Sequence, residues 1–147
     1  MIRDITTKRN YSNPPVLPPV SITNHTTFNT DAMDTQGARG AEMLVVTGAM
    51  TGNDANDTIT PVLQESNDLV SANYTNVAAS DIVGGALPGA LAPNSDVKIG
   101  YIGMKRYIRI QFVFVGTGIS AVVVGVAGCV EFASLMPGTD PSPLLTA

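Results

Sequence analysis

The stretch Arg106-Tyr107-Ile108-Arg109-Ile110-Gln111-Phe112-Val113-Phe114 decides the fold class of this chain. Its side chains alternate with a period of two, which places successive residues on opposite faces of a β-strand. One face is expected to lie in a core and the other to be wetter. The core face holds Ile108, Ile110, Phe112 and Phe114, and the wetter face holds Tyr107, Arg109 and Gln111.

A second run with the same period follows the turn signal Gly116-Thr117-Gly118. Its larger residues, Val122, Val124, Val126, Val130 and Phe132, share one face, and the other face holds Ala121, Val123, Gly125, Ala127 and Cys129. The two runs are predicted to form a hairpin. Small residues let a second layer approach closely, so this sheet is expected to be covered on both sides, by another sheet or by a neighbouring subunit.

Residues 112–130 carry no charge, and a stretch of nineteen residues could also span a bilayer as a helix. The turn in its middle and its many β-branched residues favour the hairpin over a membrane helix.

Upstream, short strand patterns alternate with turn clusters. Residues 41–47 and 58–66 are predicted to be strands that form a hairpin around a loop at 48–57. A short strand is expected at 73–77, and a long loop of small residues at 80–96. Several short strands with no amphipathic helix predict an all-β fold, an antiparallel β-sandwich or jelly roll.

Both ends of the chain are predicted to be extended arms. Residues 1–36 contain Asn13-Pro14-Pro15-Val16-Leu17-Pro18-Pro19-Val20, whose prolines favour an extended run. Because apolar residues recur there, the arm is expected to lie along a surface, its own or a neighbour's. The sandwich is predicted at 37–133, and residues 134–147 form a second extended tail.

The overall composition of the 147 residues excludes several function classes. Eight Lys and Arg against twelve Asp and Glu give a net charge of -4, too little positive field for a nucleic-acid groove. The first residues lack the apolar stretch of a secretory signal, which predicts synthesis in the cytosol. We expect no membrane and no nucleic acid among its partners.

Candidate catalytic and metal-binding residues are few. His25 is the only histidine, in the predicted arm, and Cys129 is the only cysteine, in an apolar strand. The sequence Asn53-Asp54-Ala55-Asn56-Asp57 offers oxygen ligands for Ca²⁺ but lacks the glycine and distal glutamate of a calcium loop. No nucleotide-binding motif occurs. The chain is therefore expected not to be an enzyme and to need no cofactor or metal.

Two stretches resemble a known group of proteins. Gln64-Glu65-Ser66-Asn67-Asp68, followed by Tyr74-Thr75-Asn76-Val77, and later the run 98–109 with Gly100-Tyr101-Ile102-Gly103-Met104-Lys105-Arg106-Tyr107-Ile108-Arg109, are similar to small tailed-bacteriophage virion proteins encoded among head genes. The similarity covers roughly residues 40 to 131. The sequence departs from the group at Leu69, where a turn glycine is common, and at Tyr74, where tryptophan is frequent.

The resemblance implies a capsid decoration, or cement, protein that forms small oligomers and binds major capsid subunits from outside. A dimer or trimer on the outer capsid surface is the expected form. A head–tail joining or tail component and a carbohydrate-binding β-sandwich on the virion surface are the alternatives. The residues expected to contact partners are apolar or basic: Pro14, Pro15, Val16, Leu17, Pro18, Pro19, Phe28, Arg106, Arg109, Leu144 and Leu145.

Overall fold

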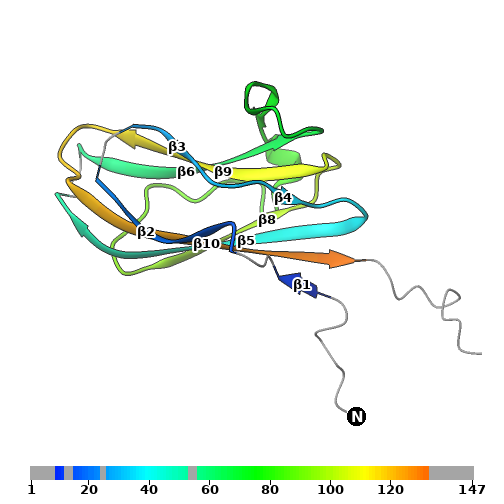
Figure 1. The fold of residues 1–147 in the computed structure, drawn as a ribbon, viewed down its shortest axis with the longest axis horizontal. Helices are drawn as coiled ribbons and strands as arrows, with labels where there is room; N and C mark the ends of the chain where they lie inside the picture. Colours follow the sequence, from blue (N-terminus) through cyan, green and yellow to red (C-terminus); the bar gives the residue numbers. More distant parts are fainter. Residues whose placement is uncertain (1–8, 12–14, 24–25, 53–55, 133–147) are drawn as a thin grey trace, which may run out of the picture.

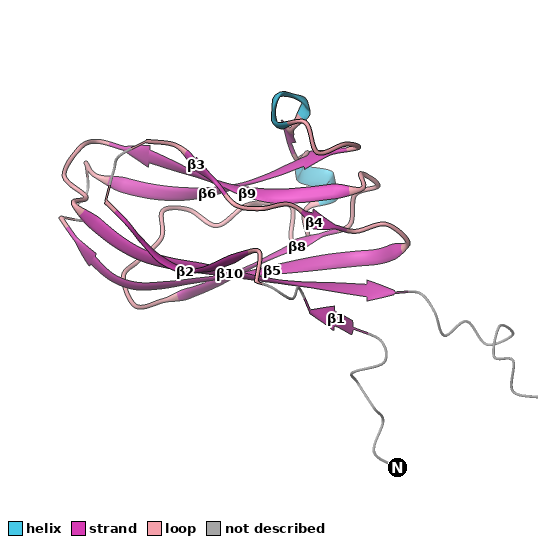
Figure 2. Cartoon of the chain, viewed as in Figure 1, coloured by secondary structure: helices cyan, strands magenta, loops and turns pink. Residues whose placement is uncertain are grey.

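A computed structural model describes residues 9–11, 15–23, 26–52 and 56–132 of the chain. Its strands form two antiparallel sheets packed face to face, so the predicted all-β sandwich is confirmed (Figures 1 and 2). The narrower jelly-roll topology stays a prediction.

The lower sheet in Figure 1, here called sheet A, has β10 and β5 at its centre. β8 pairs with the free side of β5, while β1 and β2 pair with the two ends of β10. The strands are β1 (Arg9–Tyr11), β2 (Leu17–Ile22), β5 (Ala38–Thr51), β8 (Asp96–Tyr101) and β10 (Ala121–Phe132).

The upper sheet, sheet B, has β9 and β6 at its centre. Two-residue strands flank them: β3 and β4 pair with β9, and β7 pairs with β6. The strands are β3 (Phe28–Asn29), β4 (Met33–Asp34), β6 (Thr58–Ser66), β7 (Thr75–Asn76) and β9 (Tyr107–Val115). Two single-turn 3-10 helices, η2 (Ser71–Asn73) and η3 (Ala79–Asp81), lie in the connection from β6 to β8.

The core lies between the two sheets and is made by the period-two residues. Ile108, Ile110 and Phe112 of β9 are fully buried, as the alternation predicts, and Phe114 is partly buried. Sheet A contributes buried residues from β5 and β10 to the same cluster, Met43, Val45, Val122, Val124 and Val126. The sequence period therefore identifies the inward face of both long central strand pairs.

Both predicted hairpins are wrong. β5 pairs with β8 and β10 in sheet A, whereas β6 pairs with β7 and β9 in sheet B. β9 and β10 likewise belong to different sheets. Each of these strands has an apolar face that must be covered. When the chain passes to the opposite sheet, about 10 Å away, the apolar faces of the two consecutive strands cover each other. Period-two patterns specify faces but not partners.

The described part of the predicted N-terminal arm belongs to the sandwich. β2 pairs with β10 along Val122 to Val126, and β3 and β4 extend sheet B. Val16, Ile22 and Met33 are buried in the core at 4%, 7% and 7% exposure. The boundary placed at residue 36 is corrected accordingly, because these apolar side chains are covered by the chain's own core. The predicted tail at 134–147 lies outside the described residues.

Candidate partner-binding surfaces

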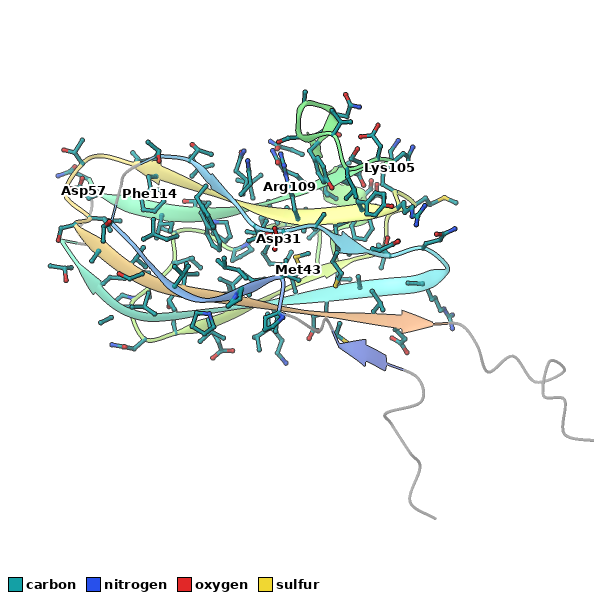
Figure 3. The ribbon with its side chains drawn as sticks, in the orientation of Figure 1. Asp31, Met43, Asp57, Lys105, Arg109 and Phe114 are labelled. Carbon is teal, nitrogen blue, oxygen red and sulfur yellow. The ribbon has the colours of Figure 1, made fainter. Side chains whose placement is uncertain are left out.

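Arg109 extends from β9 onto the outer face of sheet B, beside the loop that rises above this sheet (Figure 3). Its Nε donates a hydrogen bond to Oε1 of Gln64 at 3.0 Å, and its Nη1 donates to Oγ of Ser71 at 2.9 Å. The guanidinium lies 4.0 Å from the centre of the Tyr74 ring. Only 8% of Arg109 is exposed, so the residue predicted to meet a partner instead holds a loop of its own chain.

Burial shifts the titration of both stacked groups. It lowers the pKa of the Arg109 guanidinium, because a desolvated cation is disfavoured, and it raises the pKa of the Tyr74 hydroxyl. The Tyr74 hydroxyl is buried with no hydrogen-bond partner among the described residues. The stack of cation and ring is therefore the contact that holds Tyr74 in place.

Asp68 shapes the tip of the same loop. Its Oδ1 accepts the Val70 N–H at 2.9 Å, and its Oδ2 accepts Nδ2 of Asn73 at 2.8 Å. The bond from Asn73, followed by that from Val70, lowers the pKa of the Asp68 carboxyl. The resulting turn presents Leu69 and Val70 at its tip, 65% and 56% exposed.

Tyr101 joins the two sheets at this end of the sandwich. It is 1% exposed in β8, and its hydroxyl donates to Oε2 of Glu65 on β6 at 2.7 Å. The Tyr101 hydroxyl oxygen also accepts a hydrogen bond from the Lys105 N–H at 2.9 Å. Burial, and then the bond to Glu65, raises the pKa of the Tyr101 hydroxyl. The bond therefore fixes β8 against β6 and also anchors the turn before β9.

The two stretches that carry the resemblance thus meet through hydrogen bonds from consecutive residues of β6. Gln64 binds Arg109, Glu65 binds Tyr101, and Ser66 accepts the Asp68 N–H. Glu65 and Tyr101 are 36 residues apart in sequence, and Gln64 and Arg109 are 45 residues apart, so each of these hydrogen bonds joins distant segments. The motif is a scaffold that positions a loop with an apolar tip, since its polar groups bind one another.

Arg106 is the more accessible of the two predicted arginines. Its Nη2 lies 2.9 Å from Oδ2 of Asp34, and both side chains are 44% exposed. The guanidinium also lies 4.9 Å from the centre of the Tyr107 ring. The hydrogen bonds from Arg106 lower the pKa of the Asp34 carboxyl. A half-exposed pair of this kind remains open to a partner, although it already has a contact within the chain.

A groove of about 570 Å³ runs along the edge of the sandwich between β2 and β3. Pro18, Pro19 and Val20 are exposed on it, while Leu17 and Phe28 are half-buried. Phe28 is held by its stack on Phe112, with ring centres 6.4 Å apart. The described lining residues are Leu17, Pro18, Pro19, Val20, Ser21, Ile22, Thr23 and Phe28, and none of these is charged. We call this the proline edge.

Apart from Arg106, which is half-exposed beside Asp34, the predicted contact residues fall into three sets. Leu17, Pro18, Pro19 and Phe28 come together on the proline edge, and Pro15 is exposed nearby in sequence. Val16 is in the core and Arg109 is under the loop, so neither is free to meet a partner. Pro14, Leu144 and Leu145 lie outside the described residues.

Sequence reasoning missed an exposed apolar surface, the loop tip with Leu69 and Val70. The outer face of sheet A was expected to be covered by a further layer, because small residues alternate with the core valines of β10, and Val46 and Val123 are 46% and 39% exposed there. The strand beside β10 on this face is β5, which was wrongly predicted to form a hairpin with residues 58–66.

No group of three or more potential metal ligands occurs among the described residues. Within the same part of the chain, no helix is long and apolar enough to cross a bilayer. The sequence matches no protein-family model and no curated protein.

Proposed function

We propose that the chain is a structural virion protein that binds the outside of a phage capsid lattice and stabilises it. The observation that carries the proposal is the proline edge, a groove on an edge strand whose described lining residues are mostly apolar and carry no charge. The resemblance of residues 64–68, 74–77 and 98–109 to small virion proteins supports the same function.

The proline edge suits binding by side-chain contact. Prolines have no N–H to donate, so Pro18 and Pro19 prevent a regular strand from adding to β2 at these positions. An apolar partner segment can still lie against Leu17, the two proline rings and Phe28. Exposed apolar surfaces often mark sites of protein contact.

Binding in many copies would stabilise the lattice by mass action, because a ligand that binds the assembled shell and not its separated subunits shifts the equilibrium toward the shell. The decoration protein would contribute no chemistry. The stabilisation would depend on the fraction of capsid sites that are occupied, and on how much more tightly the protein binds the assembled shell than its separated subunits.

The proposal is tested by measuring the copy number and position of the chain in purified virions of the phage whose genome encodes it. Quantitative mass spectrometry is expected to find hundreds of copies per particle, and cryo-electron microscopy to place them on the outer shell. A single ring of about a dozen copies would instead identify a head–tail joining component. Absence from purified virions would overturn the proposal.

The contact surface is tested on particles lacking the protein. Recombinant Val20→Asp chain is expected to bind them at least tenfold more weakly than the unchanged chain, because it buries a charge in the groove. Val115→Asp is the matched control, since Val115 is 56% exposed on sheet B. Equal binding by both variants would mean that the proline edge does not contact the capsid.

A further inference from the structure

We infer that the turn from β8 to β9, residues 102–106, makes a second contact with the capsid shell and places apolar side chains in a pocket of a capsid subunit. The inference rests on the proposed function, and the contact is separate from the proline edge. Three apolar side chains carry it, because Val83, Ile102 and Met104 are 59%, 54% and 98% exposed. We call these three residues the turn patch.

The members of the turn patch belong to neighbouring segments at one end of the sandwich. The Val83 N–H donates a hydrogen bond to the Gly100 carbonyl oxygen at 2.9 Å, which holds Val83 beside the end of β8. Val83 and Ile102 line the same hollow, of about 320 Å³. Met104 follows Ile102 by two residues in the turn, at the end of the sandwich where Figure 3 labels Lys105.

Hydrogen bonds to the backbone of the turn hold it in place and leave its apolar side chains uncovered. The Lys105 N–H donates to the Tyr101 hydroxyl at 2.9 Å, and the Thr35 hydroxyl donates to the Lys105 carbonyl oxygen at 2.8 Å. Gly103 lies against the Tyr101 ring, where a Cβ would be 2.5 Å from a ring carbon. A turn that is fixed before binding loses little conformational entropy when a partner covers it.

Met104 is the centre of the proposed contact. Its side chain is almost fully exposed, so it contributes little to the core of its own chain. A methionine side chain is unbranched and adapts to apolar pockets of irregular shape. With Ile102 two residues before it and Val83 beside the same hollow, the turn offers a projecting apolar surface rather than a single exposed residue. Such a surface fits a concave apolar site on another protein.

The course of the chain supports the capsid shell as that protein. Glu131 lines the same hollow as Val83 and Ile102, and residues 133–147 begin two positions later in the sequence. These residues include Leu144 and Leu145, which are predicted to contact the capsid. A segment of this length can reach at most about 50 Å. A capsid subunit bound to the turn patch is therefore within reach of the predicted tail contacts.

The charges around the turn patch favour a protein over a lipid or nucleic-acid surface. Arg106 is already paired with Asp34. The other charged residues near the patch have both signs: Lys98, Lys105, Glu42, Asp81 and Glu131. Phosphate groups bind to a surplus of positive charge, and the patch has no such surplus. An apolar pocket with a mixed polar rim, as in protein interfaces, matches it better.

Binding of the full chain to particles that lack the protein tests the inference. Met104→Asp is expected to bind at least tenfold more weakly than the unchanged chain, because it places a charge in an apolar pocket. Met104→Leu should bind within about threefold of the unchanged chain, since it keeps an apolar side chain of similar size. Val115→Asp is the matched control, because Val115 is 56% exposed at the far end of β9.

Failure of this inference and failure of the proposed function give different results. If the unchanged chain does not bind the particles, both are overturned. If the unchanged chain binds and Met104→Asp binds as well as Val115→Asp, the turn contact alone is overturned, and the proline edge is still tested by Val20→Asp.

Methionine oxidation measures the contact without a substitution. Dilute hydrogen peroxide transfers one oxygen atom to the methionine sulfur and is itself reduced to water. In the free chain, Met104 is expected to be oxidised faster than Met43, which is fully buried. On the particle, oxidation of Met104 should be at least fivefold slower, as measured by peptide mass spectrometry. An unchanged rate would overturn the inference, as would protection by phosphatidylglycerol vesicles or DNA in place of the particle.

Discussion

The outer faces of the two sheets differ in how far other parts of the chain cover them. The outer face of sheet B carries Arg109 and Gln64, and the loop with Ser71 and Tyr74 covers them with hydrogen bonds and a stacked ring. The outer face of sheet A carries small and apolar residues along β5 and β10, flanked by the exposed Glu42, Asp96, Lys98 and Glu131, and Val46 remains 46% exposed. A loop of the chain covers the outer face of sheet B, whereas apolar side chains stay exposed on the outer face of sheet A.

The contrast separates two uses of residues that look alike in sequence. Arg106 and Arg109 are three positions apart, yet one is half-exposed beside Asp34 and the other is buried under a loop. Basic residues near an apolar strand suggested partner binding for both. Arg109 holds a loop of its own chain, so of the two predicted arginines only Arg106 is accessible to a partner.

The largest effect is expected for Arg109→Ala. The substitution leaves Gln64 and Ser71 without their partner and removes the cation from the Tyr74 ring, which is expected to lower the free energy of unfolding by about 3 kcal/mol. Urea unfolding measures the loss. Arg106→Ala is the control and should cause little change, since exposed ion pairs contribute little. Similar losses in both variants would contradict the contrast between the two arginines.

The next effect concerns the edge of sheet A, which the N-terminal segment builds. Val16→Ala is expected to lower the free energy of unfolding by about 2 kcal/mol, because Val16 is 4% exposed in the core. Val20→Ala should cost less, since Val20 is 40% exposed. The same method compares them. If Val16→Ala unfolds at the urea concentration of the unchanged chain, residues 15–23 do not belong to the sandwich in solution.

How far the sequence predicted this structure depends on which interactions are local. The alternation in β9 and β10 identified the strands and their buried faces, because the period of two is a property of the strand itself. The predicted strand at 58–66 coincides with β6. Partner choice is not local. Four patterned strands can be paired in several ways that bury the same faces, and the two short-range pairings suggested by proximity were both wrong.

The candidate site was predicted in part for the same reason. Leu17, Pro18, Pro19 and Phe28 were chosen as apolar residues in an extended segment, and they meet on one edge. Val16 belongs to the same run, but its burial depends on which side of β2 faces the core. The burial of Arg109 depends on a loop 38 residues away in sequence, and no local pattern reports such a contact.

A smaller effect of opposite sign is expected for Tyr74→Phe. The Tyr74 hydroxyl is buried without a partner, so removing it is expected to raise the free energy of unfolding by about 1 kcal/mol while the ring keeps its stack on Arg109. Tyr74→Ala, which loses the ring as well, should be destabilising. A destabilised Tyr74→Phe variant would mean that the Tyr74 hydroxyl has a hydrogen-bond partner in solution. The loop would then be held on sheet B by one more hydrogen bond than those described above.

The smallest effect is a local response to acid, and it tests whether the covering loop depends on a charge. The pKa of Asp68 is lowered in the folded chain, so its contribution is present above the ordinary aspartate pKa of about 3.9 and is lost as the pH falls through the folded value. The Val70 N–H and the Asn73 side-chain amide are therefore expected to shift in NMR spectra below about pH 4, whereas the Val46 N–H on sheet A should not follow the same titration. Asp68→Asn should abolish the transition at Val70. If Val70 and Val46 titrate together, the response is global and the turn does not depend on the Asp68 charge. If Val70 alone responds, the loop over sheet B is held by electrostatic contacts that sheet A does not share, and the difference between the two faces extends to their dependence on pH.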